Sequence, residues 1–233
     1  FGLIMVLSSS SIVSINNGGS AWYMFRTQLA WSVCGFFALL VTYRMPYHIW
    51  HKWVKYVLGV GFVLMVLPFS PIGVTINGAR AWAEIGPVRF QPSEILKVAV
   101  LLYCASVLGR RRKEMENAQR TFWPIAAVWL VSAALCMVQK DFGAAIVFTC
   151  VILSTMFVAG TPLRLIGTIG AVTVMGSVFA ISASSRMQQR FLSFLDLQEN
   201  KGHSAYQVWQ SILSISNGGI TGVGAGRGTG KWG

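Results

Sequence analysis

The sequence predicts an all-α, polytopic membrane protein. Hydrophobic residues make up 54% of the 233 residues and charged residues only 11%, whereas a soluble protein normally carries about a quarter charged residues. The apolar residues gather in stretches that approach the roughly 20 residues needed for a bilayer-spanning helix. Inside a bilayer the backbone must satisfy its own hydrogen bonds. We therefore expect these stretches to form a bundle of helices.

Six stretches qualify as spans, at residues 28–43, 53–69, 92–108, 122–138, 143–159 and 163–181. The apolar start, residues 1–15, is shorter and contains Ser8–Ser11. We interpret it as the end of a further span and not as a cleaved signal peptide, because no basic segment precedes it. The prediction is therefore about seven transmembrane helices within residues 1–181. Residues 182–233 are expected to form an extracytoplasmic region with an amphipathic helix and a glycine-rich end.

Basic residues exceed acidic ones strongly, by 19 Lys and Arg to 7 Asp and Glu. In a soluble protein this excess would suggest a nucleic-acid partner. Here we expect no nucleic acid, because the basic residues of 44–55 and of 110–120 lie in alternate loops and mark those loops as cytoplasmic. The loops with Arg80 and Lys140, and the region after residue 181, are then expected on the outer side.

The first candidate site lies at RFQPSEILK, where a span begins. Pro92 suits the first position of a helix, and Gln91, Glu94 and Lys97 are three residues apart and so share one face. A well-started helix with Lys97 snorkelling to the surface would explain the pattern. We favour a pair that lines a polar cavity, because Lys97 is about 9 Å along the helix axis. A charge at that depth usually faces the bundle interior and has a partner.

A second candidate motif is QKDFG at residues 139–143, where a Lys-Asp pair interrupts an apolar stretch. The pair can form a tight turn between two spans, and Asp141 can cap the helix that follows. By the topology above, Asp141 lies on the same side of the membrane as Glu94 and the region after residue 181. Three separate segments are thus expected to bring polar groups to one face.

The region after residue 181 combines an amphipathic pattern with positive charge. In HSAYQVWQSILSIS, apolar residues recur at helical spacing, which predicts a short helix at the membrane surface. The basic residues suit a lipid-linked phosphate or pyrophosphate, but a solvated loop without a ligand has the same composition. Charge alone leaves both readings open. The phosphate candidates are Arg186, Arg190 and Arg227.

The glycine-rich run GGITGVGAGRGTGKWG matches GxGxxG literally over residues 228–233. Neither a preceding strand nor a βαβ unit is predicted, so we reject a dinucleotide-binding fingerprint and expect turns that permit close backbone approach. The histidines and cysteines lack the spacing of metal ligands, and we assign no metal site.

The chain resembles the SEDS family (shape, elongation, division and sporulation), which includes FtsW, RodA and SpoVE. The resemblance covers nearly the whole chain and rests on five segments in the family's order: GLIMVLSSSS, NGARAW, GPVRFQPSEILK, QKDFGAAIVF and GHSAYQVWQSILSISNGGITGVGAGRGTGK. The loops resemble the FtsW branch more than the RodA branch.

The resemblance implies a peptidoglycan glycosyltransferase of about ten membrane helices. It would polymerise lipid II on the outer face of the bacterial cytoplasmic membrane, at the division septum, with a class B penicillin-binding protein and other divisome membrane proteins. A divalent cation, Mg²⁺ or Mn²⁺, is allowed as a cofactor but not required. The implied catalytic candidates are Glu94, Lys97 and Asp141. The implied substrate-binding residues are Arg80, Gln91, Arg186, Arg190, Tyr206, Gln207, Gln210, Ser211 and Arg227.

Three departures from the family pattern bear on these roles. The family's proposed catalytic Asp lies in an LPExxxDF-like segment that would follow Gly233, so we expect residues 1–233 alone to be inactive. Lys140 stands where the family has Pro, and Ala81 separates Arg80 from the loop Trp82. The assignment of Arg80 is therefore weaker than that of Glu94.

Three other functions compete with a division polymerase. The first is a RodA-like elongation polymerase, and the second is a non-catalytic divisome scaffold. The third is a lipid II flippase, which would carry charged residues in mid-span on the cytoplasmic half, and the sequence shows none there.

Overall fold

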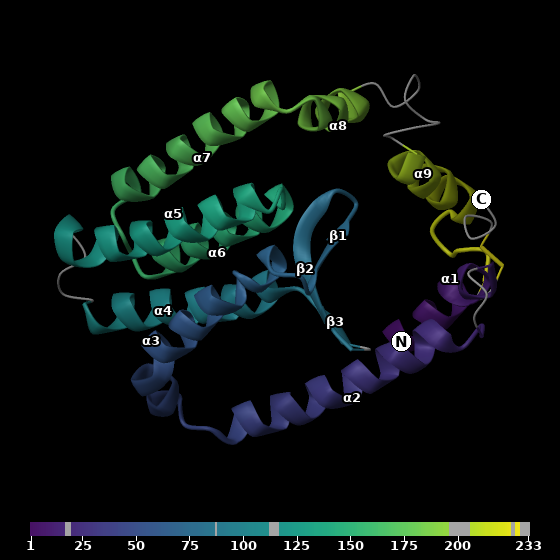
Figure 1. The fold of residues 1–233 in the computed structure, drawn as a ribbon, viewed down its shortest axis with the longest axis horizontal. Coiled ribbons are helices and arrows are strands. Elements are labelled where there is room, and N and C mark those ends of the chain that lie inside the picture. Colours follow the sequence, from purple (N-terminus) through teal and green to yellow (C-terminus); the bar gives the residue numbers. More distant parts are fainter. Residues whose placement is uncertain (17–19, 87, 112–116, 196–205, 225–226, 229–233) are drawn as a thin grey trace. The chain divides into compact units, whose positions relative to one another are not determined.

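The computed structural model describes residues 1–16, 20–86, 88–111, 117–195, 206–224 and 227–228 (Figure 1). The chain divides by its contacts into two compact units. Pro46–Ser177 form the first, here named the central unit, and Phe1–Met45 with Val178–Gly233 form the second, the terminal unit. The expected boundary at residue 181 concerns placement in a membrane and stays a prediction.

The described helices confirm the predicted helical membrane protein. Five are long and apolar enough to cross a bilayer, and two shorter apolar helices bring the number to seven. They coincide with the predicted stretches. Their bounds are α1 Gly2–Asn16, α2 Tyr23–Arg44, α3 Tyr47–Leu64, α4 Pro92–Arg110, α5 Trp123–Val138, α6 Phe142–Val158 and α7 Leu163–Ala183.

The terminal unit contains helices with little internal packing. Helix α2 packs against α1, yet none of the residues of α2 is buried within the chain. The expected amphipathic helix of the C-terminal region is α9, Tyr206–Gly218, and α8, Ser185–Leu195, precedes it. Such exposed apolar helices are typical of chain surfaces that face lipid.

The core of the central unit lies chiefly among α3, α4, α5 and α6. Helix α4 packs against α3 and α6, and α5 packs against α6. Gly61 of α3 lets α4 approach closely, since a Cβ at this position would lie 2.8 Å from Leu96 Cδ1, and small residues serve this purpose between membrane helices. The largest buried side chains of this core include Leu96, Val100, Ile125, Phe148 and Ile152.

A three-stranded antiparallel sheet stands between α3 and α4 in the chain, where the sequence analysis expected only a loop. The strands β1 (Gly73–Ile76), β2 (Ala79–Ile85) and β3 (Val88–Phe90) follow the order β1-β2-β3. Asn77 and Gly78 make the β1–β2 turn with φ of 48° and 75°. Asn-Gly between two strands is a strong hairpin signal, so the sequence did contain this information.

Candidate functional site

Polar groups from four segments meet at the sheet end of the central unit. The Gln91 Nε2 group donates to Asp141 Oδ2 at 2.6 Å, which joins the start of α4 to the α5–α6 turn. The backbone N–H of Arg80 in β2 donates to the Gln139 carbonyl at 3.0 Å. The Gln139 side chain, 1% exposed, donates in turn to the Met65 carbonyl at 2.8 Å. The sheet, α3 and the turn are thereby held together.

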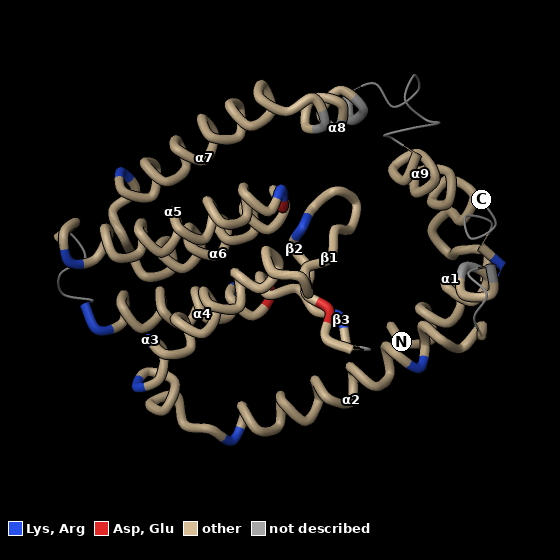
Figure 2. Tube along the Cα trace, viewed as in Figure 1, with Lys and Arg blue, Asp and Glu red and all other residues tan. Residues whose placement is uncertain are grey.

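The acidic residues of the described chain gather at this end. They are Glu84 of β2, Glu94 of α4 and Asp141 of the turn (Figure 2). Glu94 and Asp141 thus lie at the same end of the central unit, and that this end is the outer side of the membrane stays a prediction.

Asp141 has both carboxylate oxygens engaged. Its Oδ1 accepts the backbone N–H of Ala144 at 3.1 Å, so Asp141 is the predicted N-cap of α6. Its Oδ2 accepts the hydrogen bond from Gln91. A carboxylate held on both sides is well suited to position other groups and poorly placed to take up a proton.

The α5–α6 turn has a backbone that a proline could not form. Lys140 has a φ of 60°, and its N–H donates to the Met137 carbonyl at 3.0 Å. The proline ring fixes φ near −65° and removes the N–H donor. This turn therefore requires a residue other than proline at position 140.

Glu94 and Lys97 form the ion pair that their spacing predicted. Lys97 Nζ lies 2.7 Å from Glu94 Oε1. The Lys97 side chain is 18% exposed, whereas that of Glu94 is 60% exposed. The pair therefore presents a carboxylate to the surroundings and keeps its cation half-buried behind it. That this pair lines a substrate cavity stays a prediction.

The sheet adds a second ion pair, which the sequence did not predict. Arg89 and Glu84 face each other across β3 and β2, with 2.6 Å between Arg89 Nη2 and Glu84 Oε2. Only the strand register reveals this contact. Arg80 is exposed and donates from Nη2 to the Ser70 carbonyl at 3.2 Å, so its guanidinium retains donors for an anion.

The substrate-binding candidates of the C-terminal region belong to the terminal unit. On α9, Tyr206, Gln207 and Ser211 are exposed and Gln210 is half-buried. Arg227 is exposed as well. Their placement over Glu94 and Lys97 stays a prediction. The side chains of Arg186 and Arg190, within α8, lie outside the described residues.

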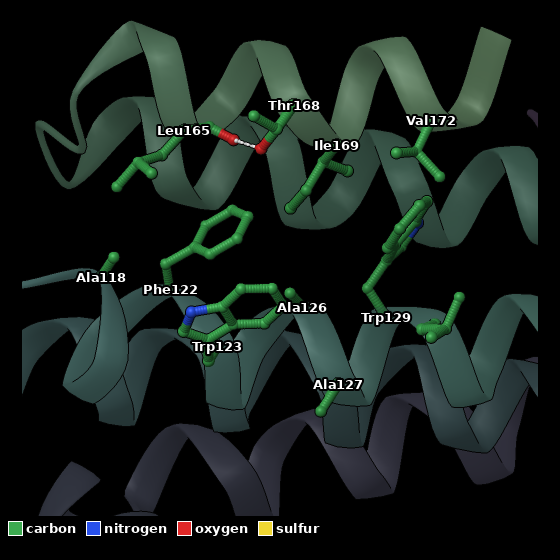
Figure 3. Close-up of a pocket in the computed structure, with 11 residues that line it drawn as sticks. Ala118, Phe122, Trp123, Ala126, Ala127, Trp129, Leu165, Thr168, Ile169 and Val172 are labelled. Atoms are coloured by element: carbon green, nitrogen blue, oxygen red, sulfur yellow. Dashed lines mark hydrogen bonds between the residues drawn. The ribbon is translucent and has the colours of Figure 1, made fainter. Parts of the chain in front are cut away.

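An apolar cavity of about 550 Å³ lies between α5 and α7 (Figure 3). Phe122, Trp123, Leu165 and Ile169 line it, and the indole of Trp129 borders it while donating to Thr149 Oγ1 at 2.9 Å. An apolar groove that opens beside membrane-spanning helices suits a hydrocarbon chain.

The described carboxylates do not fit a resident divalent cation. Mg²⁺ binds through hard oxygen ligands in a near-octahedral arrangement. Both Asp141 oxygens are hydrogen-bonded, and Glu94 and Glu84 each pair with a cation. Among the described residues, no group of three His, Cys, Asp or Glu side chains could hold a metal ion.

The family model for FtsW, RodA and SpoVE, described as a cell cycle protein, matches residues 1–233. The chain belongs to this family. Relatives named "Probable peptidoglycan glycosyltransferase FtsW" include one from Geobacter sp. (strain M18), which is 31% identical over 232 residues, or 99% of this chain and 63% of the relative. Another, from Mycobacterium tuberculosis, is 33% identical over 233 residues, or 99% of this chain and 44% of the relative.

Solved structures of this family share the fold. One, described as "Structural coordination of polymerization and crosslinking by a peptidoglycan synthase complex", matches with a TM-score of 0.64 at 25% identity, over 94% of this chain and 65% of that chain. RodA of Thermus thermophilus matches with a TM-score of 0.54 at 25% identity, over 75% of this chain and 57% of that chain. The chain thus spans about two thirds or less of these FtsW and RodA proteins.

Proposed function

We propose that the protein, at its full length, is a peptidoglycan glycosyltransferase that polymerises lipid II into glycan strands during septal wall synthesis. One observation carries the proposal: relatives named as FtsW glycosyltransferases align with 97–99% of this chain at 31–34% identity. The ion-paired, exposed carboxylate of Glu94 is the feature of the chain that suits the chemistry.

In this reaction the 4-hydroxyl of one lipid-linked disaccharide attacks the anomeric carbon of another. The new glycosidic bond forms as undecaprenyl pyrophosphate leaves, and the hydroxyl gives up its proton. A carboxylate base speeds such a step. Among the described carboxylates of residues 1–233, Glu94 is the best placed to receive the proton, because its carboxylate is exposed and its Oε1 is oriented by Lys97. Asp141 and Gln91 position the start of α4.

The departing pyrophosphate needs cations to stabilise its developing charge. Within the central unit the exposed guanidinium of Arg80 is suited to this role, and Arg227 is a further candidate from the terminal unit. Tyr206, Gln207, Gln210 and Ser211 would contact the sugars. The apolar cavity beside Trp123 and Ile169 offers a place for a hydrocarbon chain of the substrate.

The proposed location is the bacterial cytoplasmic membrane at the septum, with the Glu94 site on the outer face. Charge supports this orientation, because basic residues crowd the opposite end of α3 and α4. A class B penicillin-binding protein is the proposed partner. The similarity to a chain of a complex described as coordinating polymerization and crosslinking supports it. Other divisome membrane proteins are proposed as further partners.

The test is to reconstitute the full-length protein, with and without its penicillin-binding partner, and to supply labelled lipid II. Glycan strands resolved on a gel support the proposal. Transport of lipid II across vesicle membranes without polymer would instead identify a flippase. If the protein shows neither polymerisation nor transport, the scaffold function is supported. A cell depleted of the protein that fails to elongate, and still divides, would identify a RodA-like role.

A further inference from the structure

A basic cavity lies at the end of the central unit remote from the sheet. It has a volume of about 720 Å³ and lies between the first turns of α3, the last turns of α4 and the start of α5. Its lining includes Lys52, Lys55, Tyr56, Tyr103, Arg110 and Arg111. Four cations thus converge on one hollow from two neighbouring helices.

Carboxylates do not offset these cations in the described part of the chain. The described acidic residues are Glu84, Glu94 and Asp141, which all lie at the sheet end. The Arg111 Nη1 atom is buried and donates no hydrogen bond within the described residues. Leaving a buried donor unpaired costs free energy, and such a group in a native structure calls for a partner. An anion in the cavity would offset the positive charge of the four cations that line it.

Arg110 is held in place by His51. Its Nη2 donates to the His51 carbonyl at 3.0 Å, and its Nε donates to the ring nitrogen Nε2. The other ring nitrogen, Nδ1, lies 2.9 Å from Ser106 Oγ, within hydrogen-bond distance. The guanidinium of Arg110 is thereby fixed at the cavity wall before any ligand arrives, which lowers the entropic cost of binding.

We propose that this cavity binds the phosphate headgroup of an anionic phospholipid. The position of the cavity favours a lipid as the source of the phosphate. The cavity lies at the ends of two helices, α3 and α4, that are long and apolar enough to span a membrane. Lipid headgroups occupy that level, and basic hollows between membrane helices recognise them on the cytoplasmic side. Val54, Val107 and Pro124 also line the cavity and suit the glycerol and acyl carbons.

Native mass spectrometry of the full-length protein in detergent, titrated with phosphatidylglycerol or phosphatidylcholine of equal chain length, tests the proposal. Lys55→Gln/Arg111→Gln removes two cations from the cavity. Arg44→Gln/Arg164→Gln removes two exposed cations outside its lining and is the matched control. We expect the cavity variant to lose phosphatidylglycerol affinity by about tenfold or more. The control should stay within about twofold of the wild type, as expected when only general surface charge is lost.

Equal losses of phosphatidylglycerol affinity in the cavity variant and the control variant would overturn the proposal, because such losses would reflect surface charge alone. Complete displacement of phosphatidylglycerol by inorganic phosphate would overturn the lipid source and leave a soluble-phosphate site. If the cavity variant fails to fold, hydrogen exchange of the wild type decides. Phosphatidylglycerol, and not phosphatidylcholine, should then protect residues 51–56 and 103–111, and equal protection by the two lipids would contradict the assignment.

Discussion

Gln91 Nε2 lies 2.6 Å from Asp141 Oδ2, although the two residues are 50 positions apart in the chain. Gln91 is the N-cap of α4 and Asp141 is the N-cap of α6. One hydrogen bond therefore ties the starting points of two packed helices together. Glu94 is in the first turn of α4, so this bond also helps to fix the proposed base.

Replacing Asp141 should loosen this junction. Asp141→Ala removes the N-cap of α6 and the acceptor for Gln91, and we expect a loss of about 1–3 kcal/mol in the free energy of unfolding. Asp141→Asn keeps an acceptor oxygen for the cap and should lose less. Thermal unfolding of the full-length protein in detergent measures both. Equal stability of Asp141→Ala and the wild type would show that the junction contributes nothing.

The two halves of the Glu94–Lys97 pair should respond unequally to neutralisation. Glu94→Gln leaves the half-buried Lys97 cation without its partner, whereas Lys97→Met leaves an exposed carboxylate that water solvates. We expect Glu94→Gln to lower the free energy of unfolding by about 1–2 kcal/mol more than Lys97→Met does. A half-buried cation without a partner destabilises the folded state more than an exposed carboxylate does. Chemical denaturation of the two full-length variants measures the difference. The reverse order would contradict the observed burial.

The positive φ of Lys140 makes the α5–α6 turn sensitive to residue type. Lys140→Gly should be neutral or stabilise the protein by up to about 1 kcal/mol, since glycine adopts this conformation without steric cost. Lys140→Pro should destabilise it by about 3 kcal/mol, because the ring forbids φ of 60° and removes the donor to Met137. The melting temperatures of the Lys140→Gly and Lys140→Pro variants, compared with that of the wild type, test this prediction. A Lys140→Pro variant as stable as the wild type would mean that the turn can adopt the family's proline form.

Two glycines of α3 provide a matched test of the α3–α4 contact. A Cβ at Gly61 would lie 2.8 Å from Leu96 Cδ1, whereas one at Gly59 would meet nothing within 4 Å. Gly61→Val should therefore displace α4 and lower the unfolding free energy by about 1–3 kcal/mol. Gly59→Val should change it by less than about 0.5 kcal/mol. Similar melting temperatures for the two variants would contradict the close packing of α3 on α4.

The sequence predicted the spans because composition alone determines which segments can cross a bilayer. It also predicted the Glu94–Lys97 contact, since residues three apart on a helix are neighbours, and the capping role of Asp141. It did not predict the Arg89–Glu84 pair or the bond from Gln91 to Asp141. Those contacts depend on strand register and on how distant helix ends pack, which local spacing does not encode. Asn77-Gly78 was the overlooked local signal for the sheet.

For the terminal unit, the sequence predicted which residues belong to the candidate site but not which groups those residues contact. Tyr206 and Gln207 lie on the expected amphipathic helix α9, because apolar periodicity indicates such a helix directly. Periodicity carries no information about which group this helix faces. The proposed contacts of α9 with sugars are therefore inferred from the needs of the reaction and not from the fold.

The most direct test of the central claim is the initial rate of lipid II polymerisation by the full-length protein carrying Glu94→Gln or Glu84→Gln. Both substitutions remove an ion-paired carboxylate at the sheet end, so the second controls for charge and local stability. If Glu94 is the base, Glu94→Gln lowers the rate by about 100-fold or more at a temperature where both variants are folded, and Glu84→Gln stays within about threefold of the wild type. Wild-type rates for both variants would contradict the assignment of Glu94.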